Sequence, residues 1–178
     1  KDKKDKILQD DVLTNYEKKE IKKFNKDKIY YYGDSKSKIL TGVENFGFDN
    51  VNDCYIFRKN DHIYYRYKID QKLGNGQYGN VAKVTDMKDN TPCAIKMIKN
   101  TQRHLDMCKQ EINILIRLLN NLKLKENEKE KVVLIRKEFN FRNHLCIVTN
   151  LYYMNLYNYK CAYGRFSKKQ IVSISKDL

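Results

Sequence analysis

Alternation of apolar and polar residues predicts a sheet in the central part of the chain. Residues 80–85 read Asn-Val-Ala-Lys-Val-Thr, and residues 92–100 form a second such run after a polar turn. A period of two is typical of strands with one buried face. The only proline, Pro92, stands at the start of its strand, where a missing N–H costs least. The other three runs of the predicted five-stranded antiparallel sheet are residues 68–74, 132–141 and 145–149.

A long amphipathic helix is predicted over residues 101–122, so the fold class is α+β. Apolar residues recur there at steps of three and four, which places them on one face. They are Leu105, Cys108, Ile112, Leu115, Leu119 and Leu122. A short helix is expected at residues 154–161. Another should begin at Ser167, where Gln170 completes a capping box.

The first 67 residues carry mixed signals. Residues 1–12 are polar, so we expect a disordered tail there. A helix should begin at Thr14, because Glu17 follows it at the spacing of a capping box. Aromatic and β-branched residues favour strands, which predicts a small, mostly β region over residues 13–67. The stretches with this chemistry are 28–32, 54–58 and 63–69.

Composition adds a strong positive charge. The chain of 178 residues has 36 basic and 22 acidic residues, a net charge of +14, which favours anionic partners such as nucleotides or nucleic acid. Abundant lysine without any tryptophan also fits coding bias with solvated faces, so nucleic acid is the less favoured partner. The five cysteines and three histidines show no metal-ligand spacing, and no apolar run approaches membrane-spanning length. We therefore expect neither a metal site in this chain nor a membrane partner.

Three glycines mark the candidate site. Gly74, Gly76 and Gly79 form the pattern G-x-G-x-x-G, and glycine lets a backbone approach a phosphate closely. A dinucleotide-binding fold needs a helix directly after this pattern and an acidic residue about 20 positions on. Here a strand follows the glycines, and the residue at that distance is not acidic. A protein-kinase hairpin instead needs a lysine on the next strand, which is the position of Lys96.

A lysine in this position holds the α- and β-phosphates of ATP, and a carboxylate normally holds the lysine in turn. Glu111 is the candidate partner of Lys96, because it lies at the edge of the apolar stripe of the following helix. Leu73 and Val81 bracket the glycines and would cover adenine, while the small Ala94 leaves it room.

The rest of the nucleotide site is expected at the tip of the glycine loop (residues 74–79) and in the linker segment (residues 149–152). Tyr78 would lie over the terminal phosphates. The Asn150 carbonyl and the Tyr152 N–H would bind the edge of adenine. Thr149 would guard the pocket behind adenine, and its small side chain predicts a rear pocket open to bulky inhibitors. The expected nucleotide-binding residues are Leu73, Gly74, Asn75, Gly76, Gln77, Tyr78, Gly79, Asn80, Val81, Ala94, Lys96, Thr149, Asn150, Leu151 and Tyr152.

Three longer motifs lie around this site. They are Asp61-His62-Ile63-Tyr64-Tyr65-Arg66-Tyr67, Phe139-Asn140-Phe141-Arg142-Asn143-His144-Leu145-Cys146 and Met154-Asn155-Leu156-Tyr157. With them the chain resembles the dual-specificity, tyrosine-regulated kinases (the DYRK family), and residues 13–57 resemble the accessory region of the cytoplasmic class. The resemblance covers nearly the whole chain. It implies a tail at 1–12, an accessory region at 13–67, a kinase small lobe at 68–151 and the start of a large lobe at 152–178.

This resemblance implies a kinase that phosphorylates itself on an activation-loop tyrosine and then phosphorylates Ser and Thr of protein substrates. It implies ATP and Mg²⁺ as cofactors, support of the tyrosine step by the accessory region, and a cytoplasmic location with access to the nucleus. Thr149 and Asn150 depart from the family's usual bulky gatekeeper and hinge acid, which bears on inhibitors more than on ATP.

One expectation limits this piece of sequence. The H-R-D and D-F-G motifs carry the catalytic base and the Mg²⁺ ligands of kinases, and neither occurs in these residues, so we expect the piece alone to be inactive. Two other functions stay open. One is a non-catalytic nucleotide-binding or scaffolding protein, and the other is a basic module that binds nucleic acid.

Overall fold

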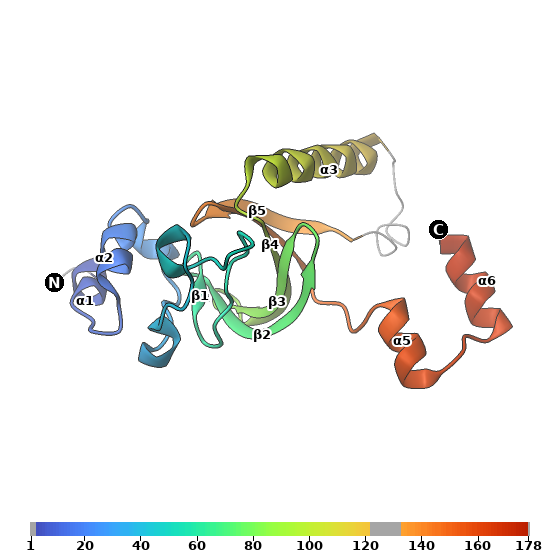
Figure 1. The fold of residues 1–178 in the computed structure, drawn as a ribbon, viewed down its shortest axis with the longest axis horizontal. Coiled ribbons are helices and arrows are strands. Elements are labelled where there is room, and N and C mark those ends of the chain that lie inside the picture. The colour runs from blue at the N-terminus through green and yellow to red at the C-terminus, as the bar shows by residue number, and fades with distance from the viewer. Residues whose placement is uncertain (1–2, 122–132, 178) are drawn as a thin grey trace.

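The computed structural model describes residues 3–121 and 133–177, and one antiparallel sheet of six strands forms its centre (Figure 1). The strand order is β1-β2-β3-β4-β6-β5. Five strands are those predicted, so the sheet is confirmed, and the two-residue β1 is an addition from the accessory region. The strands are β1 (His62–Ile63), β2 (Tyr67–Gly76), β3 (Gly79–Asp86), β4 (Thr91–Ile98), β5 (Ile135–Phe141) and β6 (His144–Asn150).

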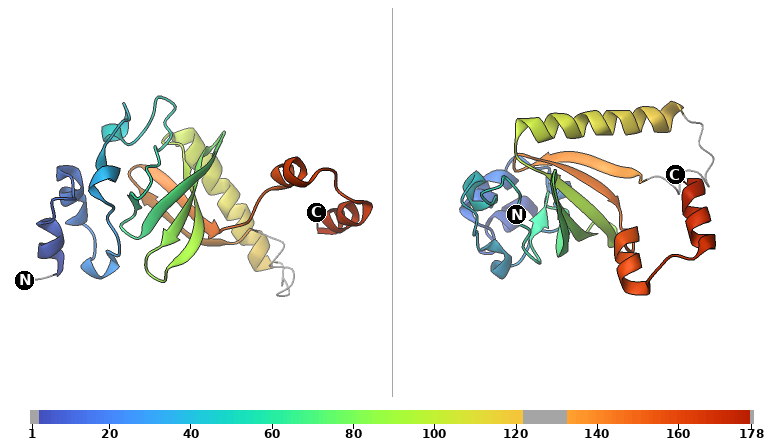
Figure 2. Two further views of the ribbon diagram at one scale, coloured as in Figure 1. Left: turned by 90° about the horizontal axis from the view of Figure 1, so that it is seen from below. Right: turned by 45° about the vertical axis from the view of Figure 1, so that its right-hand side comes forward.

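Helix α3 (Gln102–Asn121) lies along one side of the curled sheet, as the right-hand view of Figure 2 shows. Its apolar stripe packs on the sheet because Cys108 and Ile112 are buried against Ile98, Leu145 and Ile147. The predicted amphipathic helix is therefore confirmed. The predicted end of this helix, residue 122, lies outside the described residues. The same holds for residue 132, the predicted start of the strand that ends at residue 141.

The accessory region is mostly helix and irregular chain, so the prediction of a mostly β region is wrong. The capping box at Thr14 and Glu17 is confirmed. Residues 3–8 form a helix in place of the expected tail, and Ile7 is buried. The helices are α1 (Lys3–Leu8), α2 (Asn15–Ile21) and the 3-10 turns η1 (Lys26–Lys28), η2 (Ser35–Lys38) and η3 (Asn45–Gly47).

Tertiary contacts replace the expected strands. The N–H groups of Tyr30 and Tyr31 both donate to the Tyr65 carbonyl, so this stretch forms no ladder. Residues 54–58 contribute one isolated bridge, at Tyr55. Tyr64 and Tyr65 have positive φ angles of 56° and 53° and form a tight turn within the stretch 63–69. Aromatic residues favour strands, but here the packing of their side chains in the core overrides that preference and the backbone forms turns.

One hydrophobic core joins the accessory region to the sheet. Ile21, Phe48 and Tyr55 of the accessory region are buried in the same cluster as Ile95 and Val148 of the sheet. The accessory region and the sheet that carries the glycine loop therefore share one hydrophobic core. The division of the chain into the four expected segments stays a prediction.

The C-terminal end extends away from the sheet as two helices, α5 (Leu156–Tyr163) and α6 (Lys168–Asp177) (Figure 1). The predicted capping box at Ser167 and Gln170 is confirmed by hydrogen bonds in both directions. Several large apolar side chains of these helices are exposed, among them Leu156, Tyr157 and Ile171. In the described part of the chain, no helix combines the length and the apolar character needed to cross a membrane.

Candidate nucleotide site

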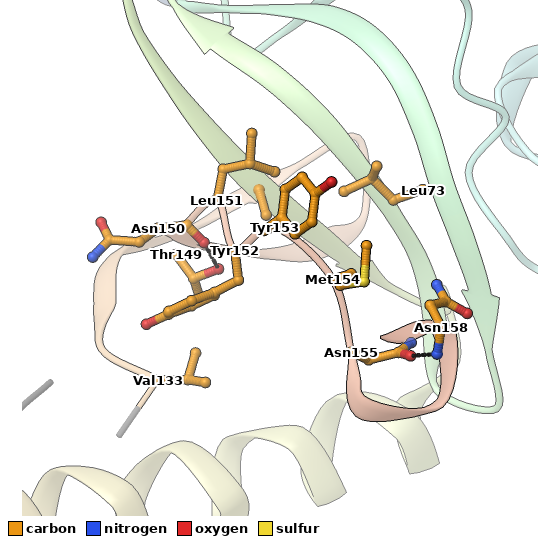
Figure 3. A pocket seen from close by; sticks show the side chains of 11 residues that line it. Leu73, Val133, Thr149, Asn150, Leu151, Tyr152, Tyr153, Met154, Asn155 and Asn158 are labelled. Carbon is orange, nitrogen blue, oxygen red and sulfur yellow. Dashed lines mark hydrogen bonds between the residues drawn. The ribbon is translucent and has the colours of Figure 1, made fainter. Parts of the chain in front are cut away.

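A pocket of about 440 Å³ lies where β2, β4 and the linker segment meet. In Figure 3, Leu73 of β2 approaches it from one side and the linker residues from the other. Six of the expected nucleotide-binding residues line it: Leu73, Ala94, Thr149, Asn150, Leu151 and Tyr152. The structure therefore brings together the residues expected around adenine, although Val81 is not part of the lining.

Five lining residues were not expected from the sequence: Val133, Tyr153, Met154, Asn155 and Asn158. Four of them directly follow the linker segment in the chain or lie in the first turn of α5. Asn155 caps that helix, because its Oδ1 accepts a hydrogen bond from the Asn158 N–H at 2.7 Å. The cap turns the chain back under the pocket. An asparagine at the start of the short helix predicted over residues 154–161 is a local signal that could have indicated this cap, because asparagine is a preferred N-cap residue.

The Asn150 carbonyl, the expected acceptor for adenine, already accepts a hydrogen bond from the Thr149 hydroxyl at 3.1 Å (Figure 3). A backbone carbonyl has two lone pairs, so a second donor can still bind there. Thr149 is half-buried at the pocket wall. Its role as a small gatekeeper stays a prediction.

The glycine loop is a tight hairpin in which Gln77 and Tyr78 form the turn between β2 and β3. Among its three glycines, only Gly79 has neighbours so close that they leave no room for a side chain. A Cβ on Gly79 would lie 2.0 Å from the Met97 carbonyl oxygen, whereas a Cβ on Gly74 would meet nothing within 4 Å. The space beside Gly74 is therefore open to a ligand, and the base of the loop is pressed against β4.

Lys96 lies on β4, opposite Val81 of β3 and Ile147 of β6. Its Nζ is 5.6 Å from the centre of the Tyr78 ring. Among the described residues no ion pair joins Lys96 to Glu111, which is exposed on α3. A cation over an aromatic face is worth about as much as an exposed ion pair or more. The expected pair is thus not formed in this structure, and Lys96 faces Tyr78 instead.

Lys96 and Glu111 both lie within electrostatic range of one buried thiol. Both act on the Cys108 thiol, whose pKa is raised by burial, lowered by the charge of Lys96 and raised by that of Glu111. Tyr78 also contacts α3, because its ring lies 6.2 Å from the His104 ring. The Tyr78 ring therefore lies between the loop, Lys96 and the start of the helix that carries Glu111.

Asn80 differs from its expected role. Its side chain is buried, and its Nδ2 donates to the Tyr55 carbonyl of the accessory region at 2.9 Å. It therefore points toward the accessory region and makes no part of the pocket lining described above. Asn75 and Gln77, in contrast, are exposed at the tip of the loop, and their expected contact with a nucleotide stays a prediction.

A buried charge network attaches the accessory region to the turn between β5 and β6. Glu17, Asp61 and His62 bring ligand atoms within 4.8 Å of one another, in the manner of a metal site. The Lys38 ammonium lies 2.6 Å from Glu17 and 3.1 Å from Asp61, and Arg142 lies 3.3 Å from Glu17. The chain thus supplies its own cations to this cluster.

Hydrogen bonds define the protonation of the network. His62 Nδ1 accepts from the Tyr65 N–H, so the ring proton is on Nε2, which faces Glu17 at 2.9 Å. Burial lowers the pKa of His62, in agreement with a neutral ring. Burial alone would raise the pKa of Glu17, but the hydrogen bond from His62, together with the hydrogen bond and charge of Lys38, brings it well below its usual value. A neutral histidine and an ionised glutamate therefore coexist in the core.

Comparison with known proteins finds several protein kinases among the relatives of this chain. No protein-family model matches the chain. The human dual specificity tyrosine-phosphorylation-regulated kinase 3 is 35% identical over 149 residues, which cover 82% of the chain and 24% of that protein. The corresponding kinase 2 of Drosophila melanogaster is 34% identical over 168 residues, 89% of the chain and 22% of that protein. The serine/threonine-protein kinase ppk5 of Schizosaccharomyces pombe is 38% identical over 152 residues, 82% of the chain and 18% of that protein. The chain thus spans a quarter or less of the length of these relatives.

Proposed function

Because the chain belongs to the family of dual specificity tyrosine-phosphorylation-regulated kinases, we propose that it is the ATP-binding part of such a protein kinase. One observation carries the proposal. The pocket between Leu73, Ala94 and the linker segment lies beside an open glycine loop, and Lys96 stands on the strand between them. Adenine would enter the pocket, and its phosphates would extend under the loop.

Each part of the site has a separate task in this proposal. Leu73 and Ala94 enclose the adenine ring, and the linker segment supplies backbone groups for its edge. The backbone N–H groups around Gly74 and Gly76 bind phosphate oxygens, because no side chain blocks that approach. Mg²⁺ neutralises charge on the phosphates in kinases, and its ligands would come from residues outside this chain.

Lys96 would exchange partners when the nucleotide binds. Its Nζ now faces the Tyr78 ring. A bound phosphate carries a full negative charge, and charge-assisted hydrogen bonds are about twice as strong as neutral ones. Lys96 would therefore turn toward the phosphates, and Glu111 would then hold it in place from α3.

The natural protein that carries these residues would phosphorylate itself on tyrosine and phosphorylate Ser and Thr of protein substrates. The names of the relatives support this, since they describe dual-specificity and serine/threonine kinases. We extend the proposal to a cytoplasmic location with access to the nucleus, on the basis of the resemblance described above.

The test is the substitution Lys96→Met in the full-length protein, with Lys88→Met as the matched control. Lys88 is exposed in the turn between β3 and β4, away from the pocket. We expect Lys96→Met to lower kcat by at least about 100-fold, because one preorganised electrostatic contact contributes that much to catalysis. Lys88→Met should leave activity unchanged.

Other outcomes would favour other functions. If the unmodified protein binds ATP without transferring phosphate, the chain belongs to a non-catalytic nucleotide-binding protein. Equal activity of Lys96→Met and the unmodified protein would refute the assignment of the site.

A further inference from the structure

Residues 98–100, at the end of β4 and just before α3, are hydrogen-bonded both to the glycine loop and to the accessory region. On the loop side, the Lys99 N–H donates to the Tyr78 carbonyl at 2.9 Å. On the accessory side, the Asn100 N–H donates to the Asp53 carbonyl at 2.9 Å. Three parts of the chain that lie far apart in sequence therefore meet at one point beside the site.

Asp49 holds this stretch through its side chain. It is fully buried, and its Oδ2 accepts a hydrogen bond from Asn100 Nδ2 at 3.2 Å. Its Oδ1 lies 2.7 Å from Nε2 of His144, whose Nδ1 lies 2.6 Å from the Ile98 carbonyl oxygen. The carboxylate thus reaches both ends of the stretch, once directly and once through the imidazole.

Asn80 makes a second attachment at the base of the glycine loop. It follows Gly79, whose backbone is in close contact with Met97. Its Nδ2 donates to the Tyr55 carbonyl at 2.9 Å, and its side chain is buried. Tyr55 is itself fully buried, so the acceptor cannot move freely.

From these contacts we propose that loop 49–55 of the accessory region is a clamp on the phosphate side of the nucleotide site. Asn80 and Asn100 are positioning residues: they touch no ligand, but they set where the glycine loop and the start of α3 stand. The ligand named in this inference, ATP, rests on the proposed function. The clamp itself rests only on the contacts of the described residues.

The physical reason is the uneven anchoring of the glycine loop. Residues 71–77 are exposed, whereas Gly79 and Asn80 are buried. A hairpin with a free tip takes its position from its base, and small displacements of groups that bind a substrate weaken its binding and its reaction strongly. Loop 49–55 should therefore act on every phosphoryl transfer by the mature enzyme, and not only on the self-phosphorylation of tyrosine.

The first experiment measures hydrogen exchange of the 178-residue chain without nucleotide. Asn80→Ala and Asn100→Ala each remove one attachment, and Asn52→Ala is the control because Asn52 is exposed on the same loop. We expect the amides of residues 74–79 to exchange about tenfold faster in Asn80→Ala, since a lost buried hydrogen bond corresponds to that factor. Asn100→Ala should speed exchange at residues 99–105, and Asn52→Ala should change neither segment.

Two results would overturn the clamp. One is unchanged exchange of the glycine loop in Asn80→Ala. The other is an equal acceleration at β6, which would mean that these contacts serve the stability of the whole fold.

The second experiment uses the full-length protein, already phosphorylated on tyrosine, with a peptide substrate. We expect Asn80→Ala to raise KM for ATP about five- to tenfold while kcat changes less than about threefold. An unchanged KM would refute the effect on the nucleotide site. If the unmodified protein binds no ATP, the proposed function fails, and the exchange experiment alone decides whether the clamp exists.

Discussion

Arg142 gives the sharpest test of how the accessory region is attached to the sheet. Its guanidinium is fully buried at the turn between β5 and β6. It pairs with Glu20 of α2 at 3.0 Å and with Glu17 at 3.3 Å, and it donates to the Tyr55 hydroxyl at 3.0 Å. It also stacks on Phe48, with its central carbon 3.9 Å from the ring centre. One side chain thus joins α2 and the core of the accessory region to the sheet.

The substitution Arg142→Met keeps an apolar stem against Phe48 and removes the charge. Loss of one partner from a buried ion pair costs about 3–5 kcal/mol. Glu17 keeps Lys38 and His62 as partners, and the Glu20 side chain is 15% exposed and can turn to water. We therefore expect the lower end of that range, about 3 kcal/mol.

Urea unfolding measures this loss. For a chain of this size a slope of about 2 kcal/mol per molar urea is typical, so the midpoint should fall by about 1.5 M. Arg103→Met is the matched control, because Arg103 is exposed on α3, and it should shift the free energy of unfolding by less than about 0.5 kcal/mol. If Arg142→Met lowers the free energy of unfolding by no more than the control does, the proposed attachment through Arg142 is refuted.

Two further predictions concern pH and the glycine loop. The lowered pKa of His62 means that the folded state binds fewer protons than the unfolded state, so stability should be full above pH 6.5 and fall as the pH drops below it. Below about pH 4.5 protonation of Glu17, whose pKa is also lowered, should add to the loss of stability. Urea midpoints at pH 7.5, 5.5 and 4 test both steps. Equal midpoints at the three pH values would contradict a neutral His62 and an ionised Glu17 in the folded protein. Gly79→Ala should destabilise the fold by about 2 kcal/mol or more, because its Cβ would lie 2.0 Å from a backbone oxygen, and Gly74→Ala by less than about 1 kcal/mol. Thermal unfolding compares the two variants, and equal melting temperatures would show that the contact at Gly79 relaxes without cost.

Local signals in the sequence predicted the parts of the fold that depend on neighbouring residues. The alternation in β3 and β4 and the stripe of α3 reflect the period of each element, and both were confirmed. The capping boxes at Thr14 and Ser167 are closed within four residues, so no distant contact was needed to predict them. Leu73 and the linker segment were predicted to line the pocket from their positions relative to the glycine loop and to the last strand of a kinase small lobe.

Distant contacts decided what the sequence could not. The tyrosines of the accessory region have strand propensity, yet Tyr64 and Tyr65 form a turn because the core needs their side chains there. Lys96 faces the ring of Tyr78 and not the carboxylate of Glu111, and the spacing of these residues along the chain does not predict that choice.

The direction of Asn80 shows the same limit most clearly. Its position after Gly79 suggested that Asn80 contacts the nucleotide. Only the fold shows that its side-chain amide donates to the Tyr55 carbonyl instead. The sequence by itself determined the five main strands, the long helix and six of the residues that line the pocket, because those depend on local periodicity and on the spacing of motifs. The tertiary structure alone decided which polar side chains meet, because a hydrogen bond depends on positions in space to within a fraction of an ångström.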